Sequence, residues 1–130
     1  MTSKKKILLV EDEPSLRQLV TISLKSKEMF ELITAKNGRE ALELASKEKP
    51  DLVLLDVIMP QMSGYDVMRE LKKNPETASI PVVFMSACFR SEDSDEGLKM
   101  GAVAHICKPF DPRKLGEEIS KIFQKINLSS

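Results

Sequence analysis

The sequence has little of several features that particular classes of protein require. Two cysteines, Cys88 and Cys107, are too few for a disulfide framework and lack the spacing of a zinc site, so we expect reduced, buried thiols. Twenty basic and twenty acidic residues cancel and aromatic residues make up 5%, so nucleic acid and anionic membranes are not expected partners. The first apolar run, Ile7 to Val10, is too short for a signal peptide or a membrane span. We therefore expect a cytoplasmic protein.

The 130 residues suit one domain, because 42% of them are hydrophobic and that fraction can build a core. We find no linker or low-complexity tract. We expect a single domain over residues 1–130 with its core from about residue 5 to residue 127, either a protein by itself or an excised fragment.

Short apolar runs alternate along the chain with segments of helical periodicity. The expected strands are Lys6–Val10, Phe30–Thr34, Leu52–Leu55, Val82–Met85 and Val103–Cys107. The expected helices are Pro14–Lys27, a helix capped by Asn37, one that follows Gly64 and ends before Asn74, a weakly amphipathic one over Ser91–Met100, and one that begins at Asp111-Pro112.

This alternation predicts the fold class. Strands that alternate with helices form a parallel sheet with right-handed crossovers, covered on both faces. We therefore predict an α/β, flavodoxin-like (βα)5 doubly wound sheet with strand order 2-1-3-4-5. In that order the chain reverses direction between the first and third strands, so functional groups should gather at the carboxyl ends of these two strands.

Acidic residues follow two of these strands. The stretch "ILLVEDE" ends in Glu11, Asp12 and Glu13, and the third strand ends at Asp56. Two carboxylates ~4 Å apart repel by roughly 4 kcal/mol at an effective dielectric of ~20, so such a cluster needs open water, protonation or a cation. Carboxylate oxygens at strand ends suit Mg²⁺, with Mn²⁺ as a possible substitute. Glu13 should instead face solvent at the start of the helix.

A hydroxyl and an ammonium group stand at the ends of the fourth and fifth expected strands. Ser86 ends "PVVFMS" and Lys108 follows "AHIC". A serine or a lysine after a strand is commonly a turn former or a solvated side chain. In the predicted fold, however, both point toward the acidic cluster. Acids, a metal ion, a hydroxyl donor and a cation suit phosphoryl chemistry, in which an aspartate can act as the nucleophile.

Four motifs, in order and correctly spaced, resemble the receiver domains of two-component response regulators, including the single-domain chemotaxis type: "VEDEP", "LLDVIMPQMSG", "MSA" and "KPF". The resemblance implies that Asp56 accepts a phosphoryl group and that Ser86 and Lys108 bind its oxygens. It also implies a Mg²⁺ site formed by Glu11, Asp12, Asp56 and the backbone carbonyl of Ile58. Gly64 would be the glycine of the turn after the third strand, and the peptide bond before Pro109 would be cis.

The same resemblance implies partners and a switch. The phosphoryl donor would be a phosphohistidine on a sensor histidine kinase or a histidine phosphotransfer protein, and the receiver would catalyse its own phosphorylation. The face formed by the fourth helix, fifth strand and fifth helix would bind an unknown downstream protein. Switching couples Ser86 to an aromatic ring three residues before Lys108, but this chain has His105 there, which can also be read as a partly exposed histidine on an edge strand.

The resemblance also bears on the lifetime of the phosphorylated state. Side chains two residues past Asp56 and Ser86 tune attack by water, and these are Ile58 and Cys88. Neither readily orients a water molecule by hydrogen bonding, so we expect slow hydrolysis.

Three other functions are considered. A non-phosphorylated pseudo-receiver docking module would keep the fold alone, and His105 leaves this reading open. A flavodoxin-like cofactor binder would place a phosphate where Glu11, Asp12 and Glu13 repel it. A phosphatase with an aspartyl nucleophile would need Asp-x-Asp after the first strand, whereas "EDE" has the wrong order.

Overall fold

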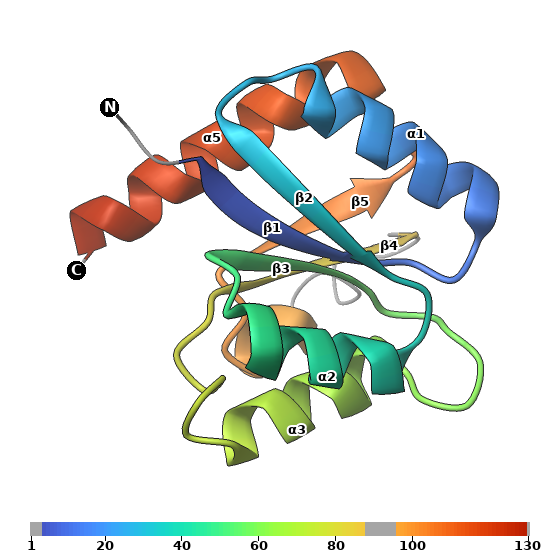
Figure 1. The fold of residues 1–130 in the computed structure, drawn as a ribbon, viewed down its shortest axis with the longest axis vertical. Helices are drawn as coiled ribbons and strands as arrows, with labels where there is room; N and C mark the ends of the chain where they lie inside the picture. Colours follow the sequence, from blue (N-terminus) through green and yellow to red (C-terminus); the bar gives the residue numbers. More distant parts are fainter. Residues whose placement is uncertain (1–3, 88–95, 130) are drawn as a thin grey trace.

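A computed structural model describes residues 4–87 and 96–129 and shows a five-stranded parallel sheet of order β2-β1-β3-β4-β5 (Figure 1). The predicted fold class and strand order are confirmed. Each strand begins and ends within two residues of its predicted bounds. The strands are β1 (Lys5–Val10), β2 (Phe30–Ala35), β3 (Leu52–Asp56), β4 (Val82–Ala87) and β5 (Ala104–Lys108).

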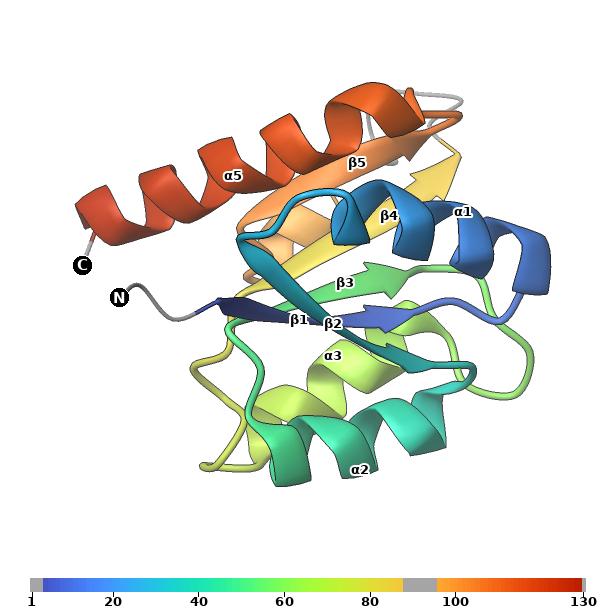
Figure 2. The ribbon, with the colours of Figure 1, turned by 45° about the horizontal axis from the view of Figure 1, so that its top comes forward.

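Helices cover both faces of the sheet. One face is packed by α1 (Pro14–Lys25) and α5 (Pro112–Ser129), and the other by α2 (Gly38–Glu48) and α3 (Gly64–Lys73) (Figure 2). Residues 96–99 are also helical, and Gly97 packs on Phe84 on the α2/α3 side. The rest of the predicted fourth helix, Ser91 to Asp95, lies outside the described residues.

The central strands are buried on both faces, which explains their nearly unbroken apolar sequence. In β3, Val53 and Leu55 belong to the core beneath α2 and α3, while Leu52 and Leu54 belong to the core beneath α1 and α5. All five residues of β3 are buried, including Asp56 at its end. A carboxylate therefore stands at the end of a fully enclosed strand.

The helix boundaries follow from local capping. Asn37 accepts a hydrogen bond from the Glu40 backbone N–H at 2.8 Å, as predicted, but the Glu40 side chain accepts from the Lys36 N–H and not from Asn37. The reciprocal capping box of the described chain is formed by Ser63 and Asp66 at the start of α3. This pair was not among the caps predicted from the sequence.

Other predictions need correction. The first helix ends at Lys25 and not Lys27, because the Lys27 N–H bonds to the Leu24 carbonyl in a turn. Cys107 is exposed on β5 and disulfide-bonded, so the expectation of a reduced, buried thiol is wrong for this residue. Cys88 lies outside the described residues. No helix in the described ranges is both long and apolar enough to cross a bilayer.

Candidate functional site

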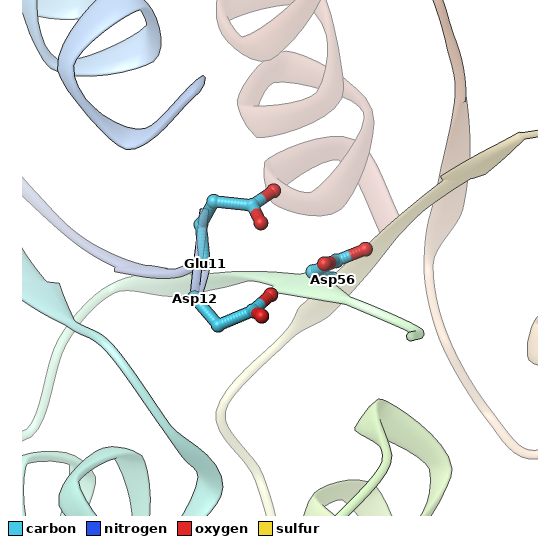
Figure 3. Close-up of side chains that lie close together, drawn as sticks. All are labelled: Glu11, Asp12 and Asp56. Carbon is cyan, nitrogen blue, oxygen red and sulfur yellow. The ribbon is translucent and has the colours of Figure 1, made fainter. Parts of the chain in front are cut away.

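Three carboxylates meet at the carboxyl ends of β1 and β3. Oxygens of Glu11, Asp12 and Asp56 all lie within 4.8 Å of one another, and Figure 3 shows the three side chains directed into one space. The parallel register pairs Val10 with Leu55, so the residues that follow them emerge side by side. The structure therefore brings together the three acids that the sequence placed at these strand ends.

Lys108 joins this cluster from β5. Its Nζ donates to Glu11 Oε1 at 3.1 Å and to Asp56 Oδ1 at 3.0 Å. The Glu11 and Asp56 side chains are 1% and 5% exposed, respectively, and the Lys108 side chain is 23% exposed. One ammonium thus bridges two buried carboxylates, while Asp12 remains partly exposed.

The positions of these charges shift the pKa values of Glu11 and Lys108. Burial, and then the charge of Asp56, raise the pKa of Glu11 to about 7, although hydrogen bonds from the Glu13 N–H and from Lys108 oppose this rise. Burial lowers the pKa of Lys108, but its hydrogen bonds and charge contacts with Asp56 and Glu11 outweigh burial and raise that pKa. Three carboxylates thus lie together with one lysine, which bridges two of them, and this excess of negative charge suits a bound cation.

Glu13 has a separate role from its two neighbours. It is exposed, and its carboxylate caps α1 by accepting from the backbone N–H groups of Ser15 at 3.1 Å and Leu16 at 2.7 Å. These hydrogen bonds lower the pKa of Glu13. The third acid of "ILLVEDE" thus faces solvent at the helix start, as expected.

Ser86 and His105 are joined by a hydrogen bond. Ser86 is buried near the end of β4, one residue past Met85, which pairs with Asp56 in the sheet register. Its Oγ lies 2.9 Å from Nε2 of His105 on β5, the edge strand of the described sheet. His105 is partly exposed, as expected of a histidine on an edge strand, but it also contacts Ser86, the residue with which a switch residue would interact.

The loops after β3 and β5 have special backbone geometry. The Gly64 N–H donates to the Val57 carbonyl at 2.7 Å, and a Cβ on Gly64 would overlap the carbonyl oxygen of Asp56. The Lys108–Pro109 peptide bond is cis, the isomer that the resemblance implies. Ile58 projects into solvent with 73% of its surface exposed.

An apolar recess of about 370 Å³ lies beside Lys108. The sequence did not predict it: helical periodicity places Leu19 on one face with Leu16, Val20 and Leu24, but in the structure Leu19 is 42% exposed. The recess is lined by Leu16, Leu19, Ala87, Lys108, Pro109 and Phe110.

Comparisons with known proteins show the family of this chain. The family model described as "Response regulator receiver domain" matches residues 7–120, and the chain belongs to this family. It is similar to a probable transcriptional regulator, ycf27, of Cyanophora paradoxa, with 39% identity over 95% of this chain and 50% of that protein. It is also similar to the alkaline phosphatase synthesis transcriptional regulatory protein PhoP of Bacillus subtilis, with 34% identity over 97% of this chain and 51% of that protein.

Solved structures give the same result. The chemotaxis response regulator CheY4 of Vibrio cholerae superposes with a TM-score of 0.84 at 31% identity, covering 92% of this chain and 99% of that one. The chain spans about half the length of the curated relatives described above. Receiver domains generally bind Mg²⁺ at an acidic pocket and are generally phosphorylated by histidine kinases.

Proposed function

We propose that Asp56 accepts a phosphoryl group from a phosphohistidine, on a sensor histidine kinase or a histidine phosphotransfer protein. The observation that carries this proposal is the placement of the Asp56 carboxylate, which is buried, in contact with Lys108 and within 4.8 Å of two other acids. A carboxylate oxygen of Asp56 attacks the phosphorus atom and the histidine N–P bond breaks. The imidazole leaves with the electron pair of that bond and takes a proton from solvent.

The acidic cluster fits a divalent cation. Hard cations take carboxylate oxygens, and oxygens of Glu11, Asp12 and Asp56 lie within 4.8 Å of one another. Burial first, and the charge of Asp56 second, raise the pKa of Glu11. We infer that Mg²⁺, or Mn²⁺ in its place, is held by Glu11, Asp12, Asp56 and the backbone carbonyl of Ile58. When bound, the ion neutralises charge on the carboxylates and on the phosphoryl oxygens.

Two side chains of the protein act on the transferred group. The ammonium of Lys108 already contacts Asp56 and pairs with a phosphoryl oxygen. The hydroxyl of Ser86, at the adjacent strand end, donates to another. Gly64 does not contact the transferred group. Because it has no Cβ, α3 can begin against the backbone carbonyl of Asp56.

The apolar recess beside Lys108 supports a macromolecular donor. Its lining carries Leu16 and Leu19 from α1 and Phe110 from the β5–α5 loop, so an apolar helix of the donor protein would dock next to the carboxylate that receives the group.

The output of this switch is proposed from the family resemblance. Phosphorylation biases the face that contains β5, α5 and the helical residues 96–99 toward binding a downstream protein. We propose that residues 1–130 form one receiver domain with its core over about residues 5–127. The chain then catalyses its own phosphorylation and dephosphorylation.

Intact-mass measurement tests the proposal. Incubation with acetyl phosphate and Mg²⁺ should add one phosphoryl group to the wild type and none to Asp56→Asn. Asp51→Asn is a matched control, because Asp51 directly precedes β3 at its amino end, whereas Asp56 is the last residue of the strand. Asp51 accepts a hydrogen bond from the Lys6 N–H. A wild type that gains no mass would indicate the docking module without phosphorylation. Equal gain by Asp56→Asn would place the acceptor elsewhere.

A further inference from the structure

The hydrogen bond between Ser86 and His105 has two possible directions. The Ser86 Oγ lies 2.9 Å from His105 Nε2, and the roles of donor and acceptor depend on which ring nitrogen carries a proton. His105 is the single histidine of the chain. A serine hydroxyl has one proton, so its direction decides what Ser86 can offer to a second partner.

The first direction makes the serine the donor. If Nε2 is unprotonated, it accepts the hydroxyl proton of Ser86. The serine oxygen then presents only lone pairs to any other group. A phosphoryl oxygen is also an acceptor, so this arrangement places two acceptors together and disfavours the phosphorylated state.

The second direction makes the histidine the donor. If Nε2 carries a proton, it donates to Ser86 Oγ, and the serine hydroxyl can donate its own proton to a phosphoryl oxygen. A chain of two hydrogen bonds then runs from the ring through Ser86 to the phosphoryl group. A phenyl ring at this position has no nitrogen and lacks this property.

We propose that His105 is a positioning residue for Ser86: in the phosphorylated state its Nε2–H donates to Ser86 Oγ and thereby directs the serine hydroxyl toward the phosphoryl group. This inference rests on the proposed function of Asp56 and adds to it a role for the histidine. Phosphorylation and protonation of Nε2 then favour each other, because each binding event stabilises the other.

The position of His105 gives this bond a route to the surface. Ser86 is buried on β4, next to the strand that ends in Asp56, whereas His105 is partly exposed on β5. β5 pairs with β4 alone in the described sheet. A change in the direction of the Ser86 hydroxyl therefore directly changes the hydrogen bonding of a side chain on the edge strand.

Nitrogen NMR of the single histidine tests the proposal directly. Beryllofluoride with Mg²⁺ serves as the phosphoryl analogue, and two-bond proton–nitrogen spectra of the ring report which nitrogen is protonated. We expect the Nε2 resonance to be that of a protonated, hydrogen-bonded nitrogen in the beryllofluoride complex, and this signature to be lost in Ser86→Ala. An unprotonated Nε2 in the complex, or the same spectrum in Ser86→Ala, would overturn the proposal.

A kinetic cycle separates positioning from a merely structural role. The rate of phosphorylation by acetyl phosphate should fall about tenfold in His105→Phe and in Ser86→Ala, the effect of one lost hydrogen bond. The double variant should be no slower than Ser86→Ala alone, because His105 acts through the serine. His105→Gln retains an N–H at the place of Nε2 and should recover most of the rate. Multiplicative effects, or equal loss in His105→Gln and His105→Phe, would overturn the proposal.

Intact mass distinguishes this inference from the proposed function. If wild-type protein gains no phosphoryl group, the function of Asp56 is wrong and the proposal falls with it. If the wild type is phosphorylated but Nε2 fails the tests above, the function of Asp56 stands and the role of His105 alone is wrong.

Discussion

The Nζ of Lys108 and Oδ1 of Asp56 lie 3.0 Å apart, although β4 separates the two strands that carry them. The same Nζ contacts Glu11 at 3.1 Å. Lysine has a long, flexible side chain, so it can span the end of the intervening strand and neutralise carboxylates on its far side. The stability of the acidic cluster therefore depends on a residue that is distant in sequence from each of the acids.

Replacing Lys108 with methionine should destabilise the metal-free protein by about 3 kcal/mol at pH 8, because two buried carboxylates lose their shared cation. The free energy of unfolding in urea measures this effect. Lys108→Arg keeps the charge and should lose less. Equal destabilisation by both substitutions would show that packing, and not charge, sets the effect of Lys108.

The raised pKa of Glu11 predicts that stability depends on pH. The folded protein holds the Glu11 proton with a pKa of about 7, against a model value of 4.5, so the contribution of Glu11 is complete below pH 4.5 and is lost as pH rises through 7. At 1.36 kcal/mol per pKa unit, the metal-free protein should lose about 3 kcal/mol between pH 4.5 and pH 8.

Urea unfolding with a chelator, at pH values between 4.5 and 8, measures this loss. Glu11→Gln should remove most of it, since the amide does not titrate. The lowered pKa values of Asp66 and Asp111 act in a lower window, since the stability they contribute is lost as pH falls below their ordinary range. A wild-type profile that is flat from pH 5 to pH 8 would contradict the burial argument for Glu11.

Magnesium should raise the melting temperature more at pH 8 than at pH 5, because at pH 5 a proton competes with the ion for Glu11. In Asp12→Asn, at least ten times more Mg²⁺ should be needed to reach the same rise in melting temperature. Glu13→Gln is the matched control from the same acidic stretch: it removes charge from a helix cap that lies outside the cluster. Equal weakening by Asp12→Asn and Glu13→Gln would argue against a specific site.

Gly64→Ala should cost more than about 2 kcal/mol of stability and slow phosphorylation, because the new methyl group meets the fixed backbone of Asp56 and Val57. Gly116→Ala provides the comparison. There the methyl group meets only the side chain of Lys27, which can move, and alanine favours helix α5 by up to about 1 kcal/mol. Chemical denaturation of both variants should therefore give changes of opposite sign.

The phosphorylated state should hydrolyse slowly, with a half-life of minutes or longer. Ile58 is exposed beside the end of β3 and offers no side-chain group to orient water, and Cys88 lies outside the described residues. Phosphate release from purified phosphorylated protein measures this rate. Ile58→Gln adds an amide and should accelerate release several-fold, while Ile58→Val should not. A wild-type half-life of seconds would contradict the prediction.

The fold and the identity of the clustered acids could be predicted from the order of residues along the chain. The apolar runs of β3 and its neighbours predict enclosed strands because burial on both faces requires them, and local capping by Asn37 and the Asn74-Pro75 break fix helix ends within a few residues. Strand order then places Glu11, Asp12 and Asp56 together at the carboxyl ends of β1 and β3, since neighbouring parallel strands end on the same side of a sheet.

The interactions among these residues, in contrast, follow from packing in three dimensions. The pKa of Glu11 depends on burial and on Asp56, which is 45 positions away in sequence and adjacent in space. The Lys108 bridge, the Ser86–His105 bond and the apolar recess join separate elements in the same way. Sequence patterns report each residue's neighbours along the chain, whereas desolvation and Coulomb energies depend on distance and on the solvent that packing excludes.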